Sequence, residues 1–278
     1  MSSLAAAVAT KRFAVVGSPI AHSRSPQLFS ALAAATGVAL AYERLEIAPD
    51  DFARAIAEGR TRYDGWNVTA PHKERALARA DDVTDDARLV GAANVLTFRA
   101  GRVAAANTDV AGVIELLRSQ GIDPRGESAT VLGAGGAGRA AVLALAHLGA
   151  RRVVVTNRTS DRALALVADL QAACGSTQLV ADVAATAAPL VINATSDGAA
   201  VARAVYACLP GGWCVDLQYK PTDTPFVRAA LEGGRRAVNG TAMLIAQAIA
   251  TFRIWFGEEI VLDAVAATRN LTAIVEAP

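Results

Sequence analysis

The glycine-rich run Gly133-Ala134-Gly135-Gly136-Ala137-Gly138 carries the clearest chemical signature in the sequence. Glycines at 133, 135 and 138 match G-x-G-x-x-G. In that pattern the first glycine permits a tight turn, the second lets a pyrophosphate approach the backbone, and the third lets helix and strand pack closely. The run lies between an expected strand, 128–132, and an expected helix, whose first amides would point at the phosphates. In this context the motif predicts a dinucleotide-binding site rather than an ordinary glycine-rich turn.

The residues after the next expected strand indicate which nicotinamide cofactor binds. They are Asn157-Arg158-Thr159, with Arg162 close by. An NAD site usually has Asp or Glu here, bonded to the ribose 2′-hydroxyl. Arg158 instead offers a planar donor fork that suits a phosphate. The alternative is a surface arginine beside a helix that Thr159 or Ser160 caps. With the glycine run upstream, the sequence favours NADP.

Two hydroxyls, Ser23 and Ser25, lie on the loop SPIAHSRSP directly after the expected first strand. Hydroxyls and helix-start amides together can bind a carboxylate. Ordinary capping of the next helix by Ser25, with Pro26 in its first turn, explains the same residues. The local pattern by itself favours this second interpretation.

Further polar clusters follow. In Asn67-Val68-Thr69-Ala70-Pro71-His72-Lys73 a strand ends in Asn and Thr, and Lys73 enters the first turn of a helix, where a cation opposes the helix dipole. That placement indicates a functional lysine, although solvated lysines are common. Asn94 follows Gly91-Ala92-Ala93. Asp109 follows Asn107-Thr108 at the start of a helix, where an N-cap is the simpler explanation.

Expected strands and helices alternate along the chain, which predicts an α/β protein with doubly wound parallel sheets. The expected strands are 12–16, 39–47, 65–69, 128–132, 152–156, 189–194 and 213–217, with a hairpin over 95–105. The expected helices are 26–36, 50–58, one from about 72, 109–119, one ending at 147, one from about 161, 241–256 and 259–270. The polar, Gly/Pro-containing run GIDPRGES near 120–127 is the best candidate linker.

Composition excludes several classes of protein. The chain has 278 residues, 53% of them hydrophobic and 19% charged, which excludes a disordered protein and suits one large or two ordinary domains. A net charge of +1 gives no electrostatic reason to expect nucleic acid or an anionic membrane as a partner. Three cysteines without CxxC spacing, no membrane-length apolar run and no signal peptide predict a cytoplasmic protein. The histidines show no metal-ligand spacing, so no metal is expected.

Taken together and in order, these motifs resemble the shikimate dehydrogenase family. The resemblance extends from Phe13 to about Gly257 and rests on SPIAHSRSP, NVTAPHK, GAAN, NTD, GAGGAG, NRT, INATSDG, TPF and MLIAQA. It implies a substrate-binding catalytic domain over 1–109 plus 245–278 and a Rossmann-type NADP-binding domain over 110–244. The active-site cleft would lie between them, and the protein would be a monomer or homodimer.

The resemblance also implies a reaction: reversible NADPH-dependent reduction of 3-dehydroshikimate to shikimate, in the shikimate pathway of aromatic amino-acid biosynthesis. Lys73 and Asp109 would be the catalytic pair. The implied substrate contacts are Ser23, Ser25, Thr69, Lys73, Asn94, Asp109, Tyr219 and Gln247. The implied cofactor contacts are Gly133, Ala134, Gly135, Gly136, Ala137, Asn157, Arg158, Thr159, Arg162, Leu217, Gly240 and Met243.

Two questions stay open at this level. An ammonium beside the reacting oxygen can supply a proton in one direction and accept it in the other, or act mainly by stabilising charge, and the sequence does not choose between these roles for Lys73. A dehydrogenase for quinate or a similar hydroxy acid, using NAD or NADP, is the nearest alternative; the paired serines and Arg158 favour shikimate with NADP. A non-catalytic dinucleotide-binding regulator is the alternative of another class, and the presence of Lys73 and Asp109 counts against it.

Overall fold

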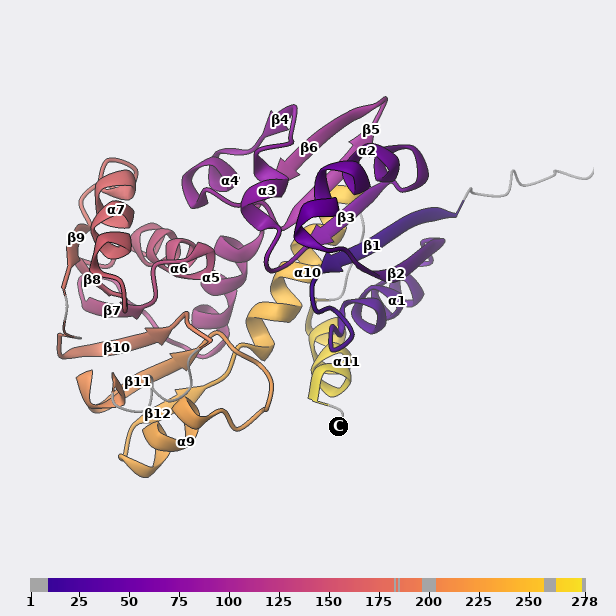
Figure 1. The fold of residues 1–278 in the computed structure, drawn as a ribbon. Coiled ribbons are helices and arrows are strands. Elements are labelled where there is room, and N and C mark those ends of the chain that lie inside the picture. Colours follow the sequence, from indigo (N-terminus) through magenta and orange to yellow (C-terminus); the bar gives the residue numbers. More distant parts are fainter. Residues whose placement is uncertain (1–9, 183, 185, 197–203, 258–263, 277–278) are drawn as a thin grey trace, which may run out of the picture. The chain divides into compact units, whose positions relative to one another are not determined.

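In the computed structural model, residues 10–182, 184, 186–196, 204–257 and 264–276 are described (Figure 1). The chain divides into two units. Among the described residues, the first comprises those within 10–84, 93–106 and 251–276, and the second comprises those within 85–92 and 107–250. The division predicted from the sequence has its boundaries at 109/110 and 244/245, so the segment 85–92 is the largest difference from the observed units.

The first unit is built on a mixed six-stranded sheet. Its strands, in spatial order, are β2 (Leu40–Glu46), β1 (Lys11–Gly17), β3 (Gly65–Val68), β5 (Val95–Arg99), β6 (Arg102–Ala106) and β4 (Asp82–Val83). β1 pairs in parallel with β2 and β3, whereas β5 is antiparallel to both β3 and β6. The expected hairpin over 95–105 is therefore present as β5–β6.

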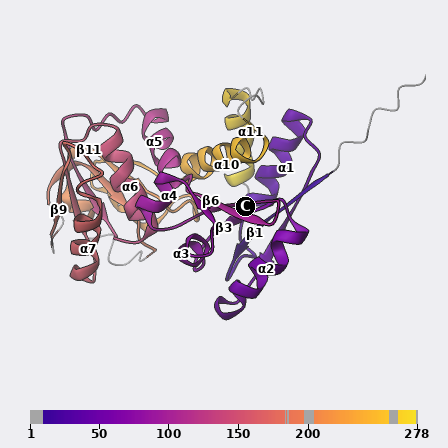
Figure 2. The same ribbon diagram turned by 90° about the horizontal axis from the view of Figure 1, so that it is seen from above.

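Helices cover both faces of this sheet because both faces are apolar. They are α1 (Ser25–Thr36), α2 (Phe52–Arg62, after the 3₁₀ turn η1, Pro49–Asp51), α3 (Lys73–Leu77) and α11 (Ala264–Glu276). Alternate residues of β1 point to opposite faces. Ala14 and Val16 pack with Phe52 of α2, while Phe13 stacks on Trp255 with the ring centroids 4.2 Å apart. Figure 2 shows α1 and α11 on one side of the sheet and α2 on the other.

The second unit has a fully parallel six-stranded sheet. In spatial order its strands are β12 (Arg236–Val238), β11 (Cys208–Asp216), β10 (Ala188–Asn193), β7 (Ser128–Leu132), β8 (Arg152–Thr156) and β9 (Gln178–Ala181). Successive strands run outward from β7 first on one side and then on the other. Ligands of such sheets bind at the carboxyl ends of the strands, where the order reverses, here between β7 and β10.

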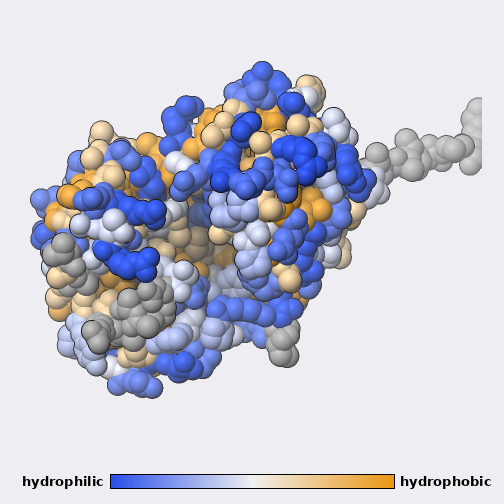
Figure 3. Space-filling model, in the orientation of Figure 1, coloured by the Kyte–Doolittle hydropathy of each residue, from blue (hydrophilic) through white to orange (hydrophobic). Residues whose placement is uncertain are grey.

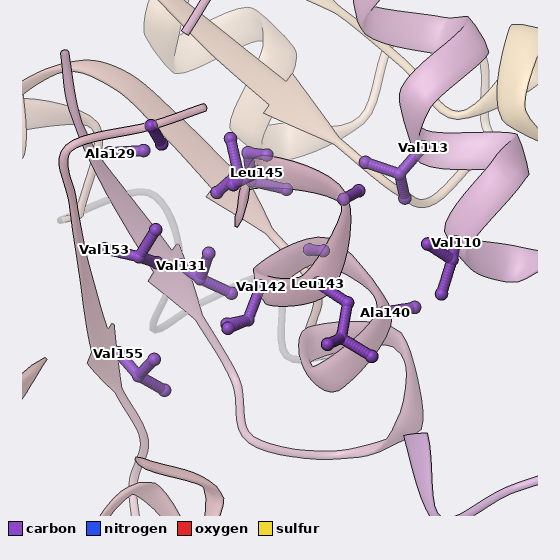
Figure 4. Close-up of a cluster of buried hydrophobic side chains, with 14 of the residues drawn as sticks. Val110, Val113, Ala129, Val131, Ala140, Val142, Leu143, Leu145, Val153 and Val155 are labelled. Atoms are coloured by element: carbon purple, nitrogen blue, oxygen red, sulfur yellow. The ribbon is translucent and has the colours of Figure 1, made fainter. Parts of the chain in front are cut away.

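The helices of this unit are α4 (Asp85–Val90), α5 (Asp109–Ser119), α6 (Gly136–His147), α7 (Ser160–Leu170), the 3₁₀ turn η2 (Val205–Ala207), α9 (Pro225–Glu232) and α10 (Thr241–Phe256), which continues into the first unit at residue 251. Figure 4 shows the core at α6. Val142 lies beside Val131 of the sheet, and Val110 and Val113 of α5 point toward the other side of the helix. Alanines on α6 let the neighbouring elements approach it closely.

The expected linker near 120–127 is a loop, but it does not join the two units. Ile122 is buried with the core of the second unit, and the Gly126 N–H donates to the Gly149 carbonyl at 2.9 Å. Burial and backbone pairing therefore hold the loop on the second unit. Its Gly/Pro content reflects tight turns, not a domain boundary. The chain instead passes between units at 84/85, 92/93, 106/107 and 250/251.

Other differences from the expected elements are local. The helix expected over 50–58 begins as a 3₁₀ turn and extends to Arg62, and the last helix extends to Glu276. The expected start of that last helix, 259–263, lies outside the described residues, as do the end of the INATSDG run and the N-terminal residues 1–9. The elements β9 and α9 were not predicted, although Thr224-Pro225 is a helix-start signal. The short elements β4, α4 and β12 were not predicted either.

On the face seen in Figure 3, hydrophilic residues are spread widely, with hydrophobic ones scattered among them. Among the described residues, none of the helices has the length and apolar character needed to span a membrane. The cysteines Cys174, Cys208 and Cys214 are buried and form no disulfide.

Candidate active site

The hydroxyls of Ser23 and Ser25 are buried in the loop between β1 and α1. Ser23 Oγ donates to Ser25 Oγ at 3.2 Å and accepts the Ser25 backbone N–H at 3.3 Å. α1 begins at Ser25, and its N-cap position is Arg24, where there is no side-chain capping hydrogen bond. The capping interpretation of Ser25 is therefore wrong. Two adjacent hydroxyls at a helix start suit a carboxylate ligand.

Two residues of β2, Tyr42 and Arg44, support this loop and were not predicted. Arg44 donates to the Ser23 carbonyl from Nε at 3.0 Å and from Nη2 at 2.6 Å. The Tyr42 hydroxyl donates to Asn67 Oδ1 at 2.7 Å and also hydrogen-bonds the Ser25 side chain; burial raises the pKa of Tyr42 well above its ordinary value. Their i, i+2 spacing puts both residues on one face of β2, the one signal that the sequence offers.

Asn67 and Asn94 are joined across neighbouring strands of the first unit. Asn67 Nδ2 donates to the Asn94 carbonyl at 3.3 Å and to Thr251 Oγ1 at 3.4 Å. The Asn94 backbone also donates to the Ala106 carbonyl at 3.1 Å. Asn94 is thereby fixed on the sheet within the same hydrogen-bonded network as the serine loop.

The turn after β3 places Thr69 and Lys73. The Thr69 N–H donates to the Val16 carbonyl at 2.9 Å, and the Thr69 carbonyl accepts the His72 N–H at 3.0 Å. α3 then begins at Lys73, which is half-buried. The Lys73 carbonyl accepts the Ala93 N–H at 2.9 Å, so the backbone of Lys73 is bonded to the residue just before Asn94.

His72, beside Lys73, is fully buried. Its ring stacks on Phe52 with centroids 4.5 Å apart, and Nε2 lies 2.8 Å from the Ile47 carbonyl. Burial lowers the pKa of His72, so a neutral imidazole donates from Nε2. His72 therefore fastens the turn that carries Lys73 to the rest of the first unit.

In the second unit, Asp109 is the buried first residue of α5. Thr108 is the N-cap, so Asp109 is not a helix cap as the simpler interpretation expected. Asn107 Oδ1 accepts the Asp109 N–H at 2.8 Å, and Asn107 Nδ2 donates to the Ala92 carbonyl at 2.9 Å. Asn107 thus fixes the start of α5.

Gly112 allows α5 and α10 to cross closely near Gln247. A Cβ on Gly112 would lie 3.1 Å from Met243 Cγ and 3.4 Å from Gln247 Cβ. Asp109 lies one turn before Gly112, on the same side of α5. The crossing therefore places Asp109, Met243 and Gln247 in one part of the second unit.

The glycine turn has the geometry that a dinucleotide requires. A Cβ on Gly138 would lie 2.0 Å from the Gly133 carbonyl oxygen, so this glycine is needed for helix and turn to pack. Gly135 is the N-cap of α6, and a Cβ there would meet nothing within 4 Å. Protein packing therefore does not require Gly135. The space above it suits a phosphate close to the backbone and the helix amides.

Asn157 links this turn to the end of β8. Its Oδ1 accepts the Ala134 N–H at 3.2 Å, and its Nδ2 donates to the Thr159 carbonyl at 2.9 Å. Arg158, Thr159 and Arg162 follow at the surface. No side chain caps α7, whose N-cap is Thr159. The residues present fit a dinucleotide whose ribose carries a 2′-phosphate.

Leu217 and Tyr219 follow β11, and Gly240 follows β12. These strands lie on the other side of β7 from β8 and Asn157. The Gly240 N–H donates to the Gln218 carbonyl at 2.9 Å, and a Cβ on Gly240 would lie 2.3 Å from the Leu217 oxygen. Tyr219, half-buried, follows in the same turn. Just before this turn, burial raises the pKa of Asp216, a residue the sequence analysis did not single out.

The predicted site residues thus fall into a set on each unit. Ser23, Ser25, Thr69, Lys73 and Asn94 belong to the first unit, and Asp109, Tyr219, Gln247 and the cofactor residues belong to the second. Within the described part of the chain, no group of three His, Cys, Asp or Glu residues is arranged to hold a metal ion. A parallel sheet with this glycine turn, together with a second α/β unit that has a buried polar cluster, defines a two-domain nicotinamide-dependent dehydrogenase.

Comparisons with known proteins agree with this class. The family model described as shikimate dehydrogenase substrate binding domain matches residues 15–96, and that described as shikimate / quinate 5-dehydrogenase matches residues 115–205. A shikimate dehydrogenase (NADP⁺) of Acidiphilium cryptum is 42% identical, over 90% of this chain and 91% of its own. The chain belongs to the shikimate dehydrogenase family.

Solved structures show the same fold. Shikimate 5-dehydrogenase from Thermus thermophilus, in complex with NADP(H) and shikimate, superposes with a TM-score of 0.84 at 34% identity, covering 96% of this chain and all (100%) of its own. The 5-ketofructose reductase of a Gluconobacter species has a TM-score of 0.80 at 25% identity, covering 96% and 99%. The fold thus also occurs in a reductase named for a different substrate.

Proposed function

We propose that this protein catalyses the reversible NADPH-dependent reduction of 3-dehydroshikimate to shikimate, a step of the shikimate pathway. The observation that carries the proposal is the buried serine pair of the first unit, in which Ser25 is not the N-cap of α1. Shikimate is a hydroxylated ring with a carboxylate. Ser23 and Ser25 bind that carboxylate, and the neighbouring amide, hydroxyl and ammonium groups suit the ring hydroxyls.

The second unit binds the cofactor in this proposal. Gly133, Ala134, Gly135, Gly136 and Ala137 hold the pyrophosphate, and Asn157, Arg158, Thr159 and Arg162 hold the adenosine end with its 2′-phosphate. Leu217, Gly240 and Met243 line the nicotinamide end. The open space at Gly135 supports a dinucleotide at this turn. The absence of an acidic residue directly after β8 supports NADP over NAD.

Lys73 and Asp109 form the proposed catalytic pair. NADPH supplies the hydride when bound. The ammonium of Lys73 stabilises the substrate oxygen on which negative charge develops. It also holds the proton that this oxygen receives. Thr69, Asn94, Asp109, Tyr219 and Gln247 orient the ring. The bonds from the Ala93 N–H to Lys73 and from the Asp109 N–H to Asn107 support fixed positions for both catalytic residues.

The proposed setting is the cytoplasm, with a small-molecule substrate, no nucleic-acid partner, and a monomer or homodimer. Three buried cysteines without a disulfide and a net charge of +1 support these expectations. Size-exclusion chromatography with light scattering distinguishes the two oligomeric states.

A quinate-like substrate is the second candidate, because the model matching 115–205 describes shikimate and quinate enzymes together. Absorbance at 340 nm, with shikimate or quinate and with NADP⁺ or NAD⁺, tests both candidates in four combinations. Activity with shikimate and NADP⁺ alone supports the first proposal. Turnover of quinate, or with NAD⁺, assigns the protein to the alternative class. Inactivity in all four combinations rejects both candidates and favours a different substrate or a binding-only role.

A further inference from the structure

Asp216 is a carboxylate buried to 1% exposure at the end of β11, and it has no part in the function proposed above. Among the described residues, its three hydrogen-bond partners are neutral. Oδ1 accepts from Asn193 Nδ2 at 2.8 Å and from the Gln218 N–H at 3.0 Å, and Oδ2 accepts from Thr224 Oγ1 at 2.6 Å. Burying a carboxylate is costly unless hydrogen bonds compensate, so this placement calls for an explanation.

The surrounding bonds determine the direction of these contacts. Asn193 Oδ1 already accepts the Thr195 N–H at 2.9 Å, which turns the Asn193 amide nitrogen toward Asp216. Thr224 Oγ1 accepts the Val227 N–H at 3.2 Å as the cap of α9, so its own proton points to Asp216. The 2.6 Å contact lies in the range of a hydroxyl bonded to an ionised oxygen. Asp216 is thus an acceptor for three converging donors.

These donors tie together the turns that follow β10 and β11. Gln218 Nε2 donates to the Thr195 carbonyl at 2.6 Å, and the Gln218 carbonyl accepts the Gly240 N–H at 2.9 Å. Thr195 in turn packs on the glycine turn, since a Cβ on Gly133 would lie 2.9 Å from Thr195 Cγ2. A continuous set of contacts therefore runs from the glycine turn through Asp216 to Gly240.

The order of the strands in the sheet indicates which half of the cofactor lies near these contacts. Arg158 follows β8 on one side of β7, whereas β10 and β11 lie on the other side (Figure 1). A dinucleotide with its 2′-phosphate at Arg158 and its pyrophosphate at the glycine turn extends its nicotinamide end over β10 and β11.

We propose that Asp216 is a positioning residue for the nicotinamide half of NADP: its carboxylate holds the turns after β10 and β11 in the shape that receives that half, without touching cofactor or substrate. The inference rests on the proposed function, because it takes NADP as the ligand of this unit.

The test compares two ligands in Asp216→Asn, which keeps the shape of the side chain but replaces an acceptor by a donor. NADP⁺ contains the nicotinamide half, and adenosine 2′,5′-bisphosphate contains only the half that Arg158 serves. Titration calorimetry is expected to show the Kd for NADP⁺ rising about tenfold, while the Kd for the bisphosphate changes less than about twofold. The control Asp223→Asn, an exposed partner of Arg228, is expected to change neither.

A second pair of variants keeps the test decisive if Asp216→Asn does not fold. Thr224→Val removes the hydroxyl donor at similar volume and is expected to show the same ligand pattern, whereas Thr224→Ser keeps the donor and is expected to match the wild type. An equal loss for both ligands, or unchanged NADP⁺ affinity in Thr224→Val and in any folded Asp216→Asn, overturns the positioning role. A wild type that binds neither ligand instead overturns the proposed function, and this inference with it.

Discussion

Lys73 is the residue on which the proposed chemistry depends most, and the structure places it through its backbone. Its carbonyl accepts the Ala93 N–H at 2.9 Å, and the neighbouring His72 is stacked on Phe52. Because the backbone of Lys73 is held in this way, a substitution here changes the ammonium group and leaves the backbone hydrogen bond in place. Substitutions at this position therefore report on chemistry more than on folding.

Lys73→Ala is expected to lower kcat by about 10²-fold or more, as for the loss of a general acid–base group, with the melting temperature nearly unchanged. Steady-state kinetics at 340 nm and thermal unfolding measure the two effects. Lys73→Arg keeps the charge, so partial recovery of kcat would indicate an electrostatic role. The exposed Lys11→Ala is the control, and near-normal turnover of Lys73→Ala would reject the assignment.

Arg158→Ala is expected to raise the Kd for NADP⁺ about tenfold or more, because a phosphate loses its charged donor, and to leave the Kd for NAD⁺ nearly unchanged. Titration of both cofactors measures the difference. Arg228→Ala, another surface arginine of the second unit, serves as the control. Equal losses for the two cofactors would show that Arg158 does not contact the 2′-phosphate.

His72 makes stability depend on pH. Burial lowers its pKa in the folded state, so the unfolded chain binds the proton more readily. The contribution of neutral His72 is therefore fully present above its unfolded pKa of about 6.5 and is lost as pH falls through the lower, folded-state value. Urea unfolding between about pH 5 and 8 is expected to show stability falling toward acid pH.

His72→Phe is expected to reduce this acid loss. The phenyl ring can keep the stacking on Phe52 but loses the bond to the Ile47 carbonyl. It also removes Nδ1, a buried atom that has no hydrogen-bond partner among the residues that the structure describes. At pH 8 the net change is expected to stay within about 1 kcal/mol. The exposed His147→Gln is the control, and an unchanged acid slope in His72→Phe would contradict the explanation.

In the strand–turn–helix unit β7–α6, Gly138 and Gly135 are glycines for different reasons. Gly138 is needed because a Cβ there would lie 2.0 Å from the Gly133 carbonyl oxygen, which is a packing requirement. Gly135 has open space and an ordinary φ of −84°, so folding does not require a glycine there. The remaining reason for Gly135 is a ligand.

Gly135→Ala is therefore expected to fold with an unchanged melting temperature and to bind NADP⁺ about tenfold or more weakly, since its methyl group occupies the space for the pyrophosphate. Gly138→Ala is expected to lose stability, by about 1–3 kcal/mol for an overpacked contact, together with binding. Calorimetry and thermal unfolding of the two variants give the comparison. Normal NADP⁺ binding by Gly135→Ala would argue against a phosphate at this position.

The two units of the molecule contain different groups for ligand binding. The first holds the buried hydroxyl and amide cluster on a mixed sheet, and the second holds the glycine turn on a parallel sheet. A ligand stabilises the structure that binds it, by about 2.7 kcal/mol at 100 times its Kd. Each ligand is therefore expected to protect a different part of the chain.

Hydrogen–deuterium exchange tests this assignment directly. NADP⁺ alone is expected to slow exchange at the glycine turn and after β8, while β1 and β2 remain unaffected. Shikimate alone is expected to slow exchange first in the loop that contains Ser23 and Ser25. Protection of the serine loop by NADP⁺ alone, without change at the glycine turn, would contradict the division of ligands between units.

Much of the fold could be predicted because its signals are local. The helices at 109–119 and 241–256 and the strands at 128–132 and 152–156 have the bounds expected from the sequence. Their apolar periods and flanking glycines act within a few residues of each other. The proposed site residues came from short motifs for the same reason. Asp216 was missed because no local pattern marks a single polar residue in a strand. For Tyr42 and Arg44 the sequence offers only their i, i+2 spacing, which does not show what they contact.

The residue order alone was enough to predict most of the strands and helices, the glycine turn and the family. Three-dimensional packing was needed to show that Ser25 does not cap its helix, that 120–127 is not a linker, and which polar groups are neighbours. Tyr42 reaches Asn67 across the sheet, and Asp216 binds Asn193 on the neighbouring strand. The physical reason is range: turns and helix starts depend on adjacent residues, whereas partners on different strands are set by strand order, register and burial.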